Sequence, residues 1–159
     1  MKYTDENAQK NSVNFGDMEH TFFLIGLLNQ FVNRFQAAGD RFFKDISWKQ
    51  SFVLICIRLF ERPPTLKELS ELIGSSHQNV KQMLLKLEKA GYVEFIPDES
   101  DRRKQRIVPT QKTQLFTEEY DAPSSNFMEQ LFMDIDEENL AVTVKTIMAL
   151  DERLKRIEV

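Results

Sequence analysis

Side chains that can hydrogen-bond to the edges of DNA bases are concentrated between Ser76 and Lys86. Asparagine and glutamine can each make two hydrogen bonds to adenine, histidine can donate to guanine, and lysine can meet guanine or a phosphate. The alternative is an ordinary solvated polar face of a helix. The candidate contact residues of this segment are Ser76, His77, Gln78, Asn79, Lys81, Gln82 and Lys86.

A second, mostly cationic group follows at residues 101–106. It lies between two β-prone runs, residues 92–96 and 106–108, which predict a hairpin with a polar tip. Arginines on such a tip suit a narrow minor groove, because its negative potential attracts guanidinium groups. A carboxylate beside them can hold one in a fixed direction. The candidates here are Asp101, Arg102, Arg103, Lys104 and Arg106.

The distribution of charge supports the same region. The chain has a formal net charge of −4, which by itself disfavours a nucleic-acid partner. Residues 77–112, however, carry eight Lys and Arg against five Asp and Glu, a net charge of +3, so the remainder carries −7. The basic charge therefore coincides with both candidate groups, although a solvated face also accommodates so modest an excess.

A pair of short helices is predicted to position the first group. Thr65 and Glu68 have the spacing of a capping box, so a helix should begin after Thr65. Gly74 follows where a left-handed residue can close that helix. Ser75 and Ser76 are both candidate N-caps for the next helix, which should end at Gly91. The residues expected to face inward are Leu66, Leu69, Leu72, Ile73, Val80, Met83, Leu84 and Leu87.

A further helix is predicted before this pair. Ser47 and Gln50 form another capping-box match, and Pro63 with Pro64 should stop the helix that they open. Its apolar residues are Phe52, Val53, Ile55, Cys56, Leu59 and Phe60. With apolar neighbours at helical spacing, Cys56, the only cysteine, is expected to be an inert core residue instead of a redox sensor.

Two flanking helices carry more apolar surface than a small domain can cover. Residues 18–35 are apolar around much of the predicted helix, and residues 136–157 repeat apolar positions at spacings of three and four. A two-fold interface between two chains would cover these faces, and monomeric packing is the alternative. We therefore predict a mainly α fold with a small β-hairpin wing, a winged helix-turn-helix with flanking N- and C-terminal dimerisation helices.

The predicted organisation has four parts. Residues 1–15 are a polar, flexible N-terminal arm, and residues 16–46 are the N-terminal dimerisation helix and its connection. Residues 47–112 are the winged helix-turn-helix, the candidate DNA-binding domain. Residues 113–159 are the C-terminal dimerisation helices.

The motifs of residues 69–74, 79–93 and 101–103 resemble those of the MarR (multiple antibiotic resistance regulator) family. The resemblance implies a homodimer that binds a near-palindromic double-stranded operator, with a helix in the major groove and Arg103 in the minor groove. It also implies a repressor relieved by a small-molecule ligand. Pro109 and Thr113 depart from the family pattern, which usually has leucine and glycine there. The alternative is a winged-helix module that binds another protein and not DNA.

The aromatic content suggests where an effector would bind. The chain has 13 Phe, three Tyr and one Trp, and members of the family often bind aromatic or lipophilic anions between their dimerisation and reading domains. The alternative is that these rings only fill the core. The tentative pocket residues are Phe22, Phe43, Trp48, Phe52 and Phe60.

Other classes of function find little support. His20 and His77 are the only histidines and no ligand spacing is present, so no metal is expected. The sequence lacks a glycine-rich phosphate loop and a nucleophile elbow, so we expect neither a cofactor nor an enzyme. It also lacks an apolar run of about 18 residues and a signal peptide, which predicts a cytoplasmic protein without a membrane partner.

Overall fold

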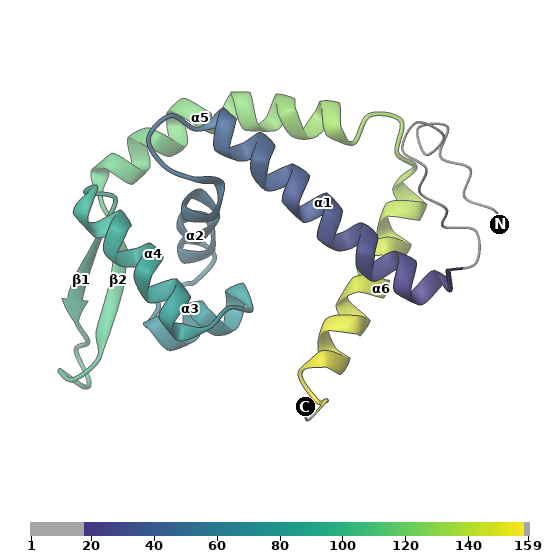
Figure 1. Cartoon of the computed structure of the whole chain (residues 1–159). Coiled ribbons are helices and arrows are strands. Elements are labelled where there is room, and N and C mark those ends of the chain that lie inside the picture. Colours follow the sequence, from purple (N-terminus) through teal and green to yellow (C-terminus); the bar gives the residue numbers. More distant parts are fainter. Residues whose placement is uncertain (1–17, 158–159) are drawn as a thin grey trace. The chain divides into compact units, whose positions relative to one another are not determined.

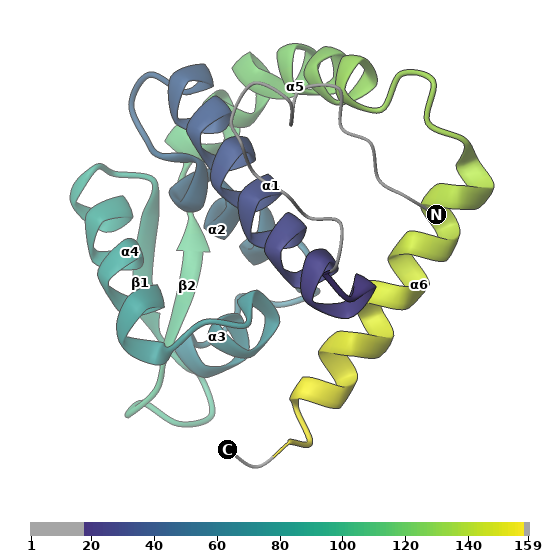
Figure 2. The ribbon, with the colours of Figure 1, turned by 45° about the vertical axis from the view of Figure 1, so that its right-hand side comes forward.

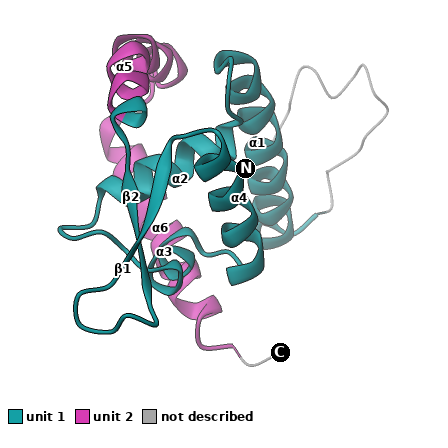
Figure 3. Cartoon of the chain, turned by 90° about the vertical axis from the view of Figure 1, so that its left-hand side faces the viewer, with its two compact units in different colours: residues 1–113 teal, residues 114–159 magenta. Residues whose placement is uncertain are grey.

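The computed structural model describes residues 18–157, so the predicted arm at residues 1–15 lies outside the described residues. The chain divides into two compact units, residues 1–113 and 114–159 (Figure 3). Its elements, in chain order, are α1 (His20–Phe42), α2 (Trp48–Arg58), α3 (Leu66–Ile73), α4 (His77–Lys89), β1 (Val93–Pro97), β2 (Gln105–Pro109), α5 (Gln111–Leu131) and α6 (Glu137–Leu154) (Figure 1). The predicted mainly α fold with a β-hairpin is confirmed.

Side-chain caps begin three helices of the first unit. Ser47 and Gln50 form a complete capping box at α2, and Thr65 and Glu68 form another at α3. At α4 the cap is Ser76, whose hydroxyl accepts a hydrogen bond from the Asn79 amide at 3.3 Å. Each cap satisfies a backbone N–H that has no partner within its helix. The three predicted starts are confirmed, and the structure selects Ser76 over Ser75.

Two glycines end the helices of the helix-turn-helix. Gly74 has φ 68° and Gly91 has φ 79°. After Gly91, the Tyr92 amide donates to the Leu87 carbonyl at 2.9 Å, while Gly91 itself donates to Glu88 at 2.8 Å. This pair of bonds is a Schellman motif, which needs a left-handed residue and therefore favours glycine. The chain can thus reverse sharply at both ends of α4.

The core of the first unit is built mainly from the inward faces of α2, α3, α4 and the two strands. Its buried apolar side chains include Val53, Leu54, Ile57, Leu69, Val80, Leu84, Leu87, Tyr92, Val93 and Ile107. β1 and β2 pair antiparallel, with Val93 opposite Pro109 and Pro97 opposite Gln105. The other edge of β2 is hydrogen-bonded to the segment that precedes α3, since the Ile107 amide donates to the Pro64 carbonyl at 2.9 Å. The hairpin is therefore anchored at its base.

Helices α1 and α2 approach closely at Gly39. A Cβ atom on Gly39 would lie 2.8 Å from the Trp48 Cβ, closer than such atoms can approach. At the next residue of α1, Asp40 Oδ1 accepts a hydrogen bond from the Trp48 amide at 2.7 Å. Glycine thus permits the approach, and the aspartate fixes the start of α2 against α1.

The end of α2 differs from the prediction. The helix ends at Arg58 with Leu59 as its C-cap, so Phe60 lies beyond it. The Leu59 amide donates to the Cys56 carbonyl and the Phe60 amide to the Ile57 carbonyl, which are bonds of the tighter three-residue spacing. Such bonds close the last turn of a helix before any proline is reached. The prolines therefore do not mark the boundary.

The second unit contains most of α5 and all of α6. Asp136 caps α6 by accepting from the Asn139 amide at 2.9 Å, and α6 has no buried residue. The large apolar side chains that α6 and the residues after it expose are Val142, Val144, Met148, Leu154 and Ile157. Within residues 18–157, no helix combines the length and hydropathy needed to span a membrane.

Candidate nucleic-acid interface

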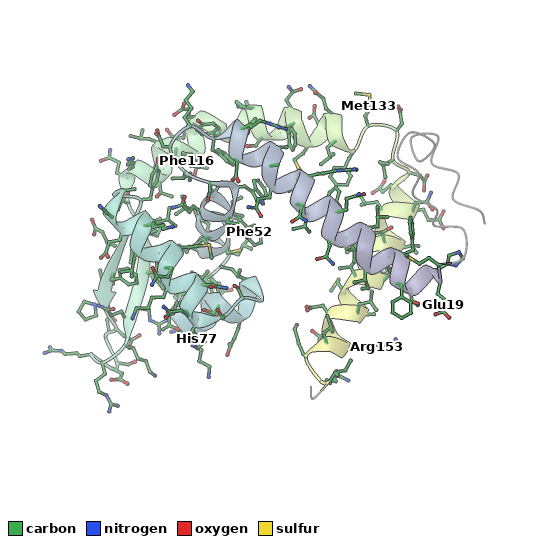
Figure 4. All side chains as sticks on the ribbon, in the orientation of Figure 1. Glu19, Phe52, His77, Phe116, Met133 and Arg153 are labelled. Carbon is green, nitrogen blue, oxygen red and sulfur yellow. The ribbon has the colours of Figure 1, made fainter. Side chains whose placement is uncertain are left out.

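The first turns of α4 present a continuous polar surface. The exposed polar side chains of this helix and its cap include Ser76, His77, Gln78, Asn79, Lys81, Gln82 and Lys86. Their inward neighbours Val80, Leu84 and Leu87 are completely buried, so the backbone beneath the polar face is held by the core. His77 marks the start of the helix in Figure 4. The structure thus brings the first predicted group together on one helix.

The N-terminal end of α4 and the tip of the hairpin lie on the same side of the first unit (Figures 1 and 2). Residues 98–104 form the connection between β1 and β2, and the candidates Arg102, Arg103 and Lys104 are all exposed there. The two groups that the sequence separates by some 20 positions are therefore presented in one direction. The start of α4 and the tip of the hairpin can therefore contact two neighbouring parts of one large ligand at the same time.

Arg103 projects from the tip with its guanidinium oriented by Asp101. Its side chain is 92% exposed. Its Nε donates to Asp101 Oδ1 at 3.1 Å, and a terminal nitrogen donates to Oδ2 at 3.4 Å. These hydrogen bonds, first from the side chain and then from the backbone of Arg103, hold the pKa of Asp101 below its ordinary value. Lys104 adds a looser ion pair to the same carboxylate at 3.8 Å.

Arg106 is engaged differently, since its side chain is only 14% exposed. Its Nε donates to Asp98 Oδ2 at 2.5 Å, and one terminal nitrogen donates to the Pro63 carbonyl at 2.9 Å and to Glu68 Oε2 at 3.2 Å. Arg106 therefore joins the wing to the start of α3. Unlike the other cations of its group, it is held inside the domain.

Asp98 folds the start of the wing loop. Its Oδ1 accepts from the Ser100 hydroxyl at 2.5 Å, the Ser100 amide at 2.9 Å and the Asp101 amide at 2.9 Å. The hydrogen bonds from Ser100 and then from Arg106 lower the pKa of this buried carboxyl far below its ordinary value. Asp98 was not among the residues predicted from the sequence to form the site. An aspartate two residues before a serine is a recognisable turn signal that could have found it.

Glu68 serves both the helix cap and the wing. One carboxylate oxygen accepts from the Thr65 amide at 2.7 Å and from Arg106, while the other pairs with Arg62 at 2.7 Å. The bonds from Thr65, the backbone amide first, lower the pKa of Glu68, and the two arginines act in the same direction. A single acidic side chain thus connects α3 to the hairpin base.

Three of the five tentative pocket residues form an aromatic stack. The ring centroids of Phe43 and Trp48 are 6.2 Å apart, those of Trp48 and Phe52 are 6.5 Å apart, and both pairs are nearly parallel. The ring contacts of residues 18–157 do not bring Phe22 or Phe60 into this stack. Phe22 is 70% exposed on α1, whereas Phe60 follows the end of α2. Cys56 is buried in the core, where desolvation raises the pKa of its thiol.

Comparison with known proteins agrees with this geometry. Residues 46–104 match the family model described as the MarR family. An uncharacterised HTH-type transcriptional regulator of Bacillus subtilis (strain 168), YybA, is 30% identical over 71 residues. That match covers 44% of this chain and only 47% of YybA, so the chain is aligned to about half of that relative.

Solved structures share the fold at low sequence identity. A MarR/EmrR family transcriptional regulator from Acinetobacter sp. ADP1 superposes with a TM-score of 0.78 at 15% identity, covering 91% of this chain and 100% of the other. Streptococcus pneumoniae FabT in complex with DNA gives a TM-score of 0.64 at 23% identity, covering 87% and 99%. The predicted resemblance is confirmed, since residues 46–104 match the MarR family model and the solved structures of that family share the fold of this chain.

Proposed function

We propose that this protein is a homodimeric transcription regulator that binds near-palindromic double-stranded DNA. In each subunit α4 enters the major groove while the wing reaches the adjoining minor groove, and the two copies of α4 meet successive major grooves about one DNA turn apart. The observation that carries this proposal is that the polar N-terminal end of α4 and the tip of the hairpin lie on the same side of the first unit, and that Arg103 on this tip is exposed. The DNA complex of FabT, which has the same fold, supports it.

The site residues divide into three roles under this proposal. His77, Gln78, Asn79 and Lys81 read base edges, because they occupy the first turns of α4. Ser76, Gln82, Lys86, Arg102 and Lys104 meet the phosphate backbone, and Arg103 enters the minor groove. Asp101 and Arg106 hold the wing in shape through the bonds described above, so Arg106 acts without touching DNA.

The homodimer is proposed from the apolar surface that the single chain leaves uncovered. In addition to α6, helix α1 exposes Phe22, Ile25, Leu27, Phe31 and Val32. Burying such a surface against a second copy is strongly favourable, and a two-fold axis would also present two copies of α4 to one duplex. Residues 16–46 and 113–159 are accordingly proposed as the dimerisation segments of the chain.

Regulation by a small aromatic or lipophilic effector completes the proposal. The stack of Phe43, Trp48 and Phe52 supplies ring faces near the close approach of α1 and α2. If the dimer has two conformations that differ in the spacing of their two α4 helices, a ligand that binds one of them better would raise the population of that conformation. We propose that such a ligand lowers operator affinity, so that the protein is a repressor that the ligand relieves.

Titration of the full chain against DNA tests the proposed binding. Fluorescence anisotropy is measured with a duplex selected from random sequence and with a mixed-sequence duplex, over a range of salt concentrations. Binding should fall steeply with salt, because phosphate contacts release counterions. A protein-interaction module without DNA binding would show no salt-sensitive association with either duplex, and that result would end the proposal.

Two variants test the assignment of the wing and of α4. Arg103→Ala should weaken binding to both duplexes, whereas Gln78→Ala should mainly relax the preference at particular base pairs. Lys49→Ala is the control, since Lys49 is an exposed cation outside α4 and the wing. If Arg103→Ala binds both duplexes like the parent at physiological salt, the wing assignment is wrong.

A further inference from the structure

Three side chains of residues 110–113 bind the backbone carbonyls that follow α4. Thr110 Oγ1 donates to the Gly91 carbonyl at 2.7 Å, and Lys112 Nζ donates to the Ala90 carbonyl at 2.9 Å. The Thr113 hydroxyl donates to the Tyr92 carbonyl. We call these three side chains, Thr110, Lys112 and Thr113, the clasp. Each of three consecutive carbonyls at the end of α4 thus has a donor from a single short segment.

Lys112 makes a second contact that fixes its direction. Its ammonium lies 4.4 Å from the centre of the Tyr92 ring, a cation–π distance, and Tyr92 is buried. The lysine stem passes Gly91, since a Cβ atom at Gly91 would lie 3.9 Å from Lys112 Cδ. The side chain therefore crosses the left-handed turn that ends α4.

The clasp complements the charge of the helix end. Carbonyls at a helix C-terminus have no intrahelical partner and carry partial negative charge, so a cation there is favourable. The Schellman motif uses the amides of Gly91 and Tyr92 as donors and does not occupy the carbonyls of residues 90–92. The Tyr92 carbonyl also accepts from the Thr110 amide at 3.0 Å, and the clasp adds a side-chain donor to each of the three carbonyls from outside the helix.

The clasp also joins α4 to the wing. β1 begins at Val93, directly after the clasped carbonyls, and β2 ends at Pro109, directly before Thr110. Val93 and Pro109 are partners in the hairpin register. One short segment therefore fixes both the C-terminal end of α4 and the base of the hairpin. The angle between α4 and the hairpin decides whether both can contact adjoining grooves of one duplex.

We infer that Lys112 is a positioning residue for DNA recognition, which holds the C-terminal end of α4 against the hairpin base so that helix and wing fit their two grooves together. This inference rests on the proposed function. Lys112 lies at the opposite end of α4 from His77, about 20 Å away for a helix of 13 residues. It therefore acts through α4 and does not contribute a phosphate contact.

The test compares Lys112→Met with Lys112→Arg in the full-length chain. Methionine keeps much of the apolar stem without the charge or the donor, and arginine keeps the cation over the Tyr92 ring. Affinities are measured for the selected duplex and the mixed-sequence duplex across a salt series. For Lys112→Met we expect on the order of tenfold weaker binding to the selected duplex, unchanged binding to the mixed duplex, and an unchanged salt slope. Lys112→Arg should restore most of the specific affinity.

A direct phosphate contact would behave differently. It would lower binding to both duplexes together and reduce the salt slope by about one, and that result would overturn the inference. Equal binding of Lys112→Met and the parent would overturn it as well. A parent that binds neither duplex would instead refute the proposed function on which the inference rests.

A second variant covers the case in which Lys112→Met does not fold. Thr113→Val removes another donor of the clasp with little change of shape, and it should likewise lower the ratio of specific to mixed-sequence binding. In Thr113→Val, and in Lys112→Met if it folds, hydrogen exchange at the Gly91 and Tyr92 amides should be faster than in the parent, because the turn that these amides close is less restrained. An unchanged binding ratio in Thr113→Val would count against the clasp.

Discussion

Two arginines of the hairpin, three positions apart, differ in what surrounds them. Arg103 is almost fully exposed and is oriented by a single carboxylate, while Arg106 is mostly buried and bonds to Asp98, Glu68 and the Pro63 carbonyl. An exposed ion pair contributes little to stability, but removing one partner from a buried network leaves polar groups without bonds. The same residue type therefore stabilises the fold at position 106, whereas at position 103 it is free to serve the proposed contact with DNA.

Alanine substitutions should separate these roles. Arg106→Ala should lower the free energy of unfolding by about 2 kcal/mol, because the hydrogen bonds of a mostly buried guanidinium are lost. Arg103→Ala should leave it unchanged while weakening DNA binding. Urea unfolding followed by circular dichroism measures the first effect and anisotropy the second. Equal stability of the two variants would show that the Arg106 network does not hold the domain.

Acid should loosen the wing through Asp98. The ordinary pKa of an aspartate is about 4, and the hydrogen bonds from Ser100 and Arg106 hold the pKa of Asp98 below that value in the folded protein. Such a group contributes stability that is fully present above the ordinary value and is lost as the pH falls below it. In Asp98→Asn, stability should be lower at neutral pH and should decline less steeply below about pH 4. Urea midpoints at a series of pH values test this, and parallel curves would contradict it.

At the scale of whole elements, two glycines of α1 form a matched pair. Gly39 packs against Trp48 with no room for a Cβ atom, whereas a Cβ atom on Gly26 would meet nothing within 4 Å. Gly39→Ala should therefore destabilise the protein by about 1–3 kcal/mol through overpacking. Gly26→Ala should stabilise it by about 0.5–1 kcal/mol through helix propensity. Thermal unfolding of both variants gives the comparison, and a stabilising Gly39→Ala would show that α1 and α2 can separate freely.

Ser76 both caps α4 and lies in the proposed DNA interface. Ser76→Ala should cost about 1 kcal/mol of stability because the Asn79 amide loses its acceptor, while Ser75→Ala should cost little. Ser76→Asp should retain the cap and the stability, but its charge should repel phosphate and weaken DNA binding. Unfolding and anisotropy measurements on the three variants separate these effects. Undiminished DNA binding by Ser76→Asp would place the start of α4 outside the interface.

Local signals in the sequence predicted the elements better than the contacts between them. The caps at Ser47, Thr65 and Ser76 and the turn at Gly74 depend on residues within a few positions, so their patterns are visible in the chain. The partners of Arg106 at Pro63 and Glu68 are 43 and 38 positions away, which no local pattern reveals. Its position in the sequence therefore grouped Arg106 with the exposed cations of the wing, although the folded domain buries most of its side chain.

At the scale of the whole molecule, the surface that the single chain leaves uncovered is the strongest argument for a second copy. Helix α6 buries none of its residues but exposes several large apolar ones. Among them, Val144 and Met148 are four positions apart and so share one face of the helix. We therefore expect the protein to be a dimer at micromolar concentration, and under the proposed function its two copies of α4 should bind one operator together.

Removing two apolar side chains from α6 tests this proposal. In the double variant Val144→Gln with Met148→Gln, the dissociation constant of the dimer should rise by at least about a hundredfold, because each chain loses two buried side chains. Lys145→Gln is the control, since its side chain is exposed and polar. Sedimentation equilibrium measures association, and anisotropy should show loss of operator binding in parallel, because one copy of α4 covers only half a palindrome. Tight operator binding by a variant that sediments as a single chain would contradict the dimer model, even if DNA recognition by α4 and the wing were correct.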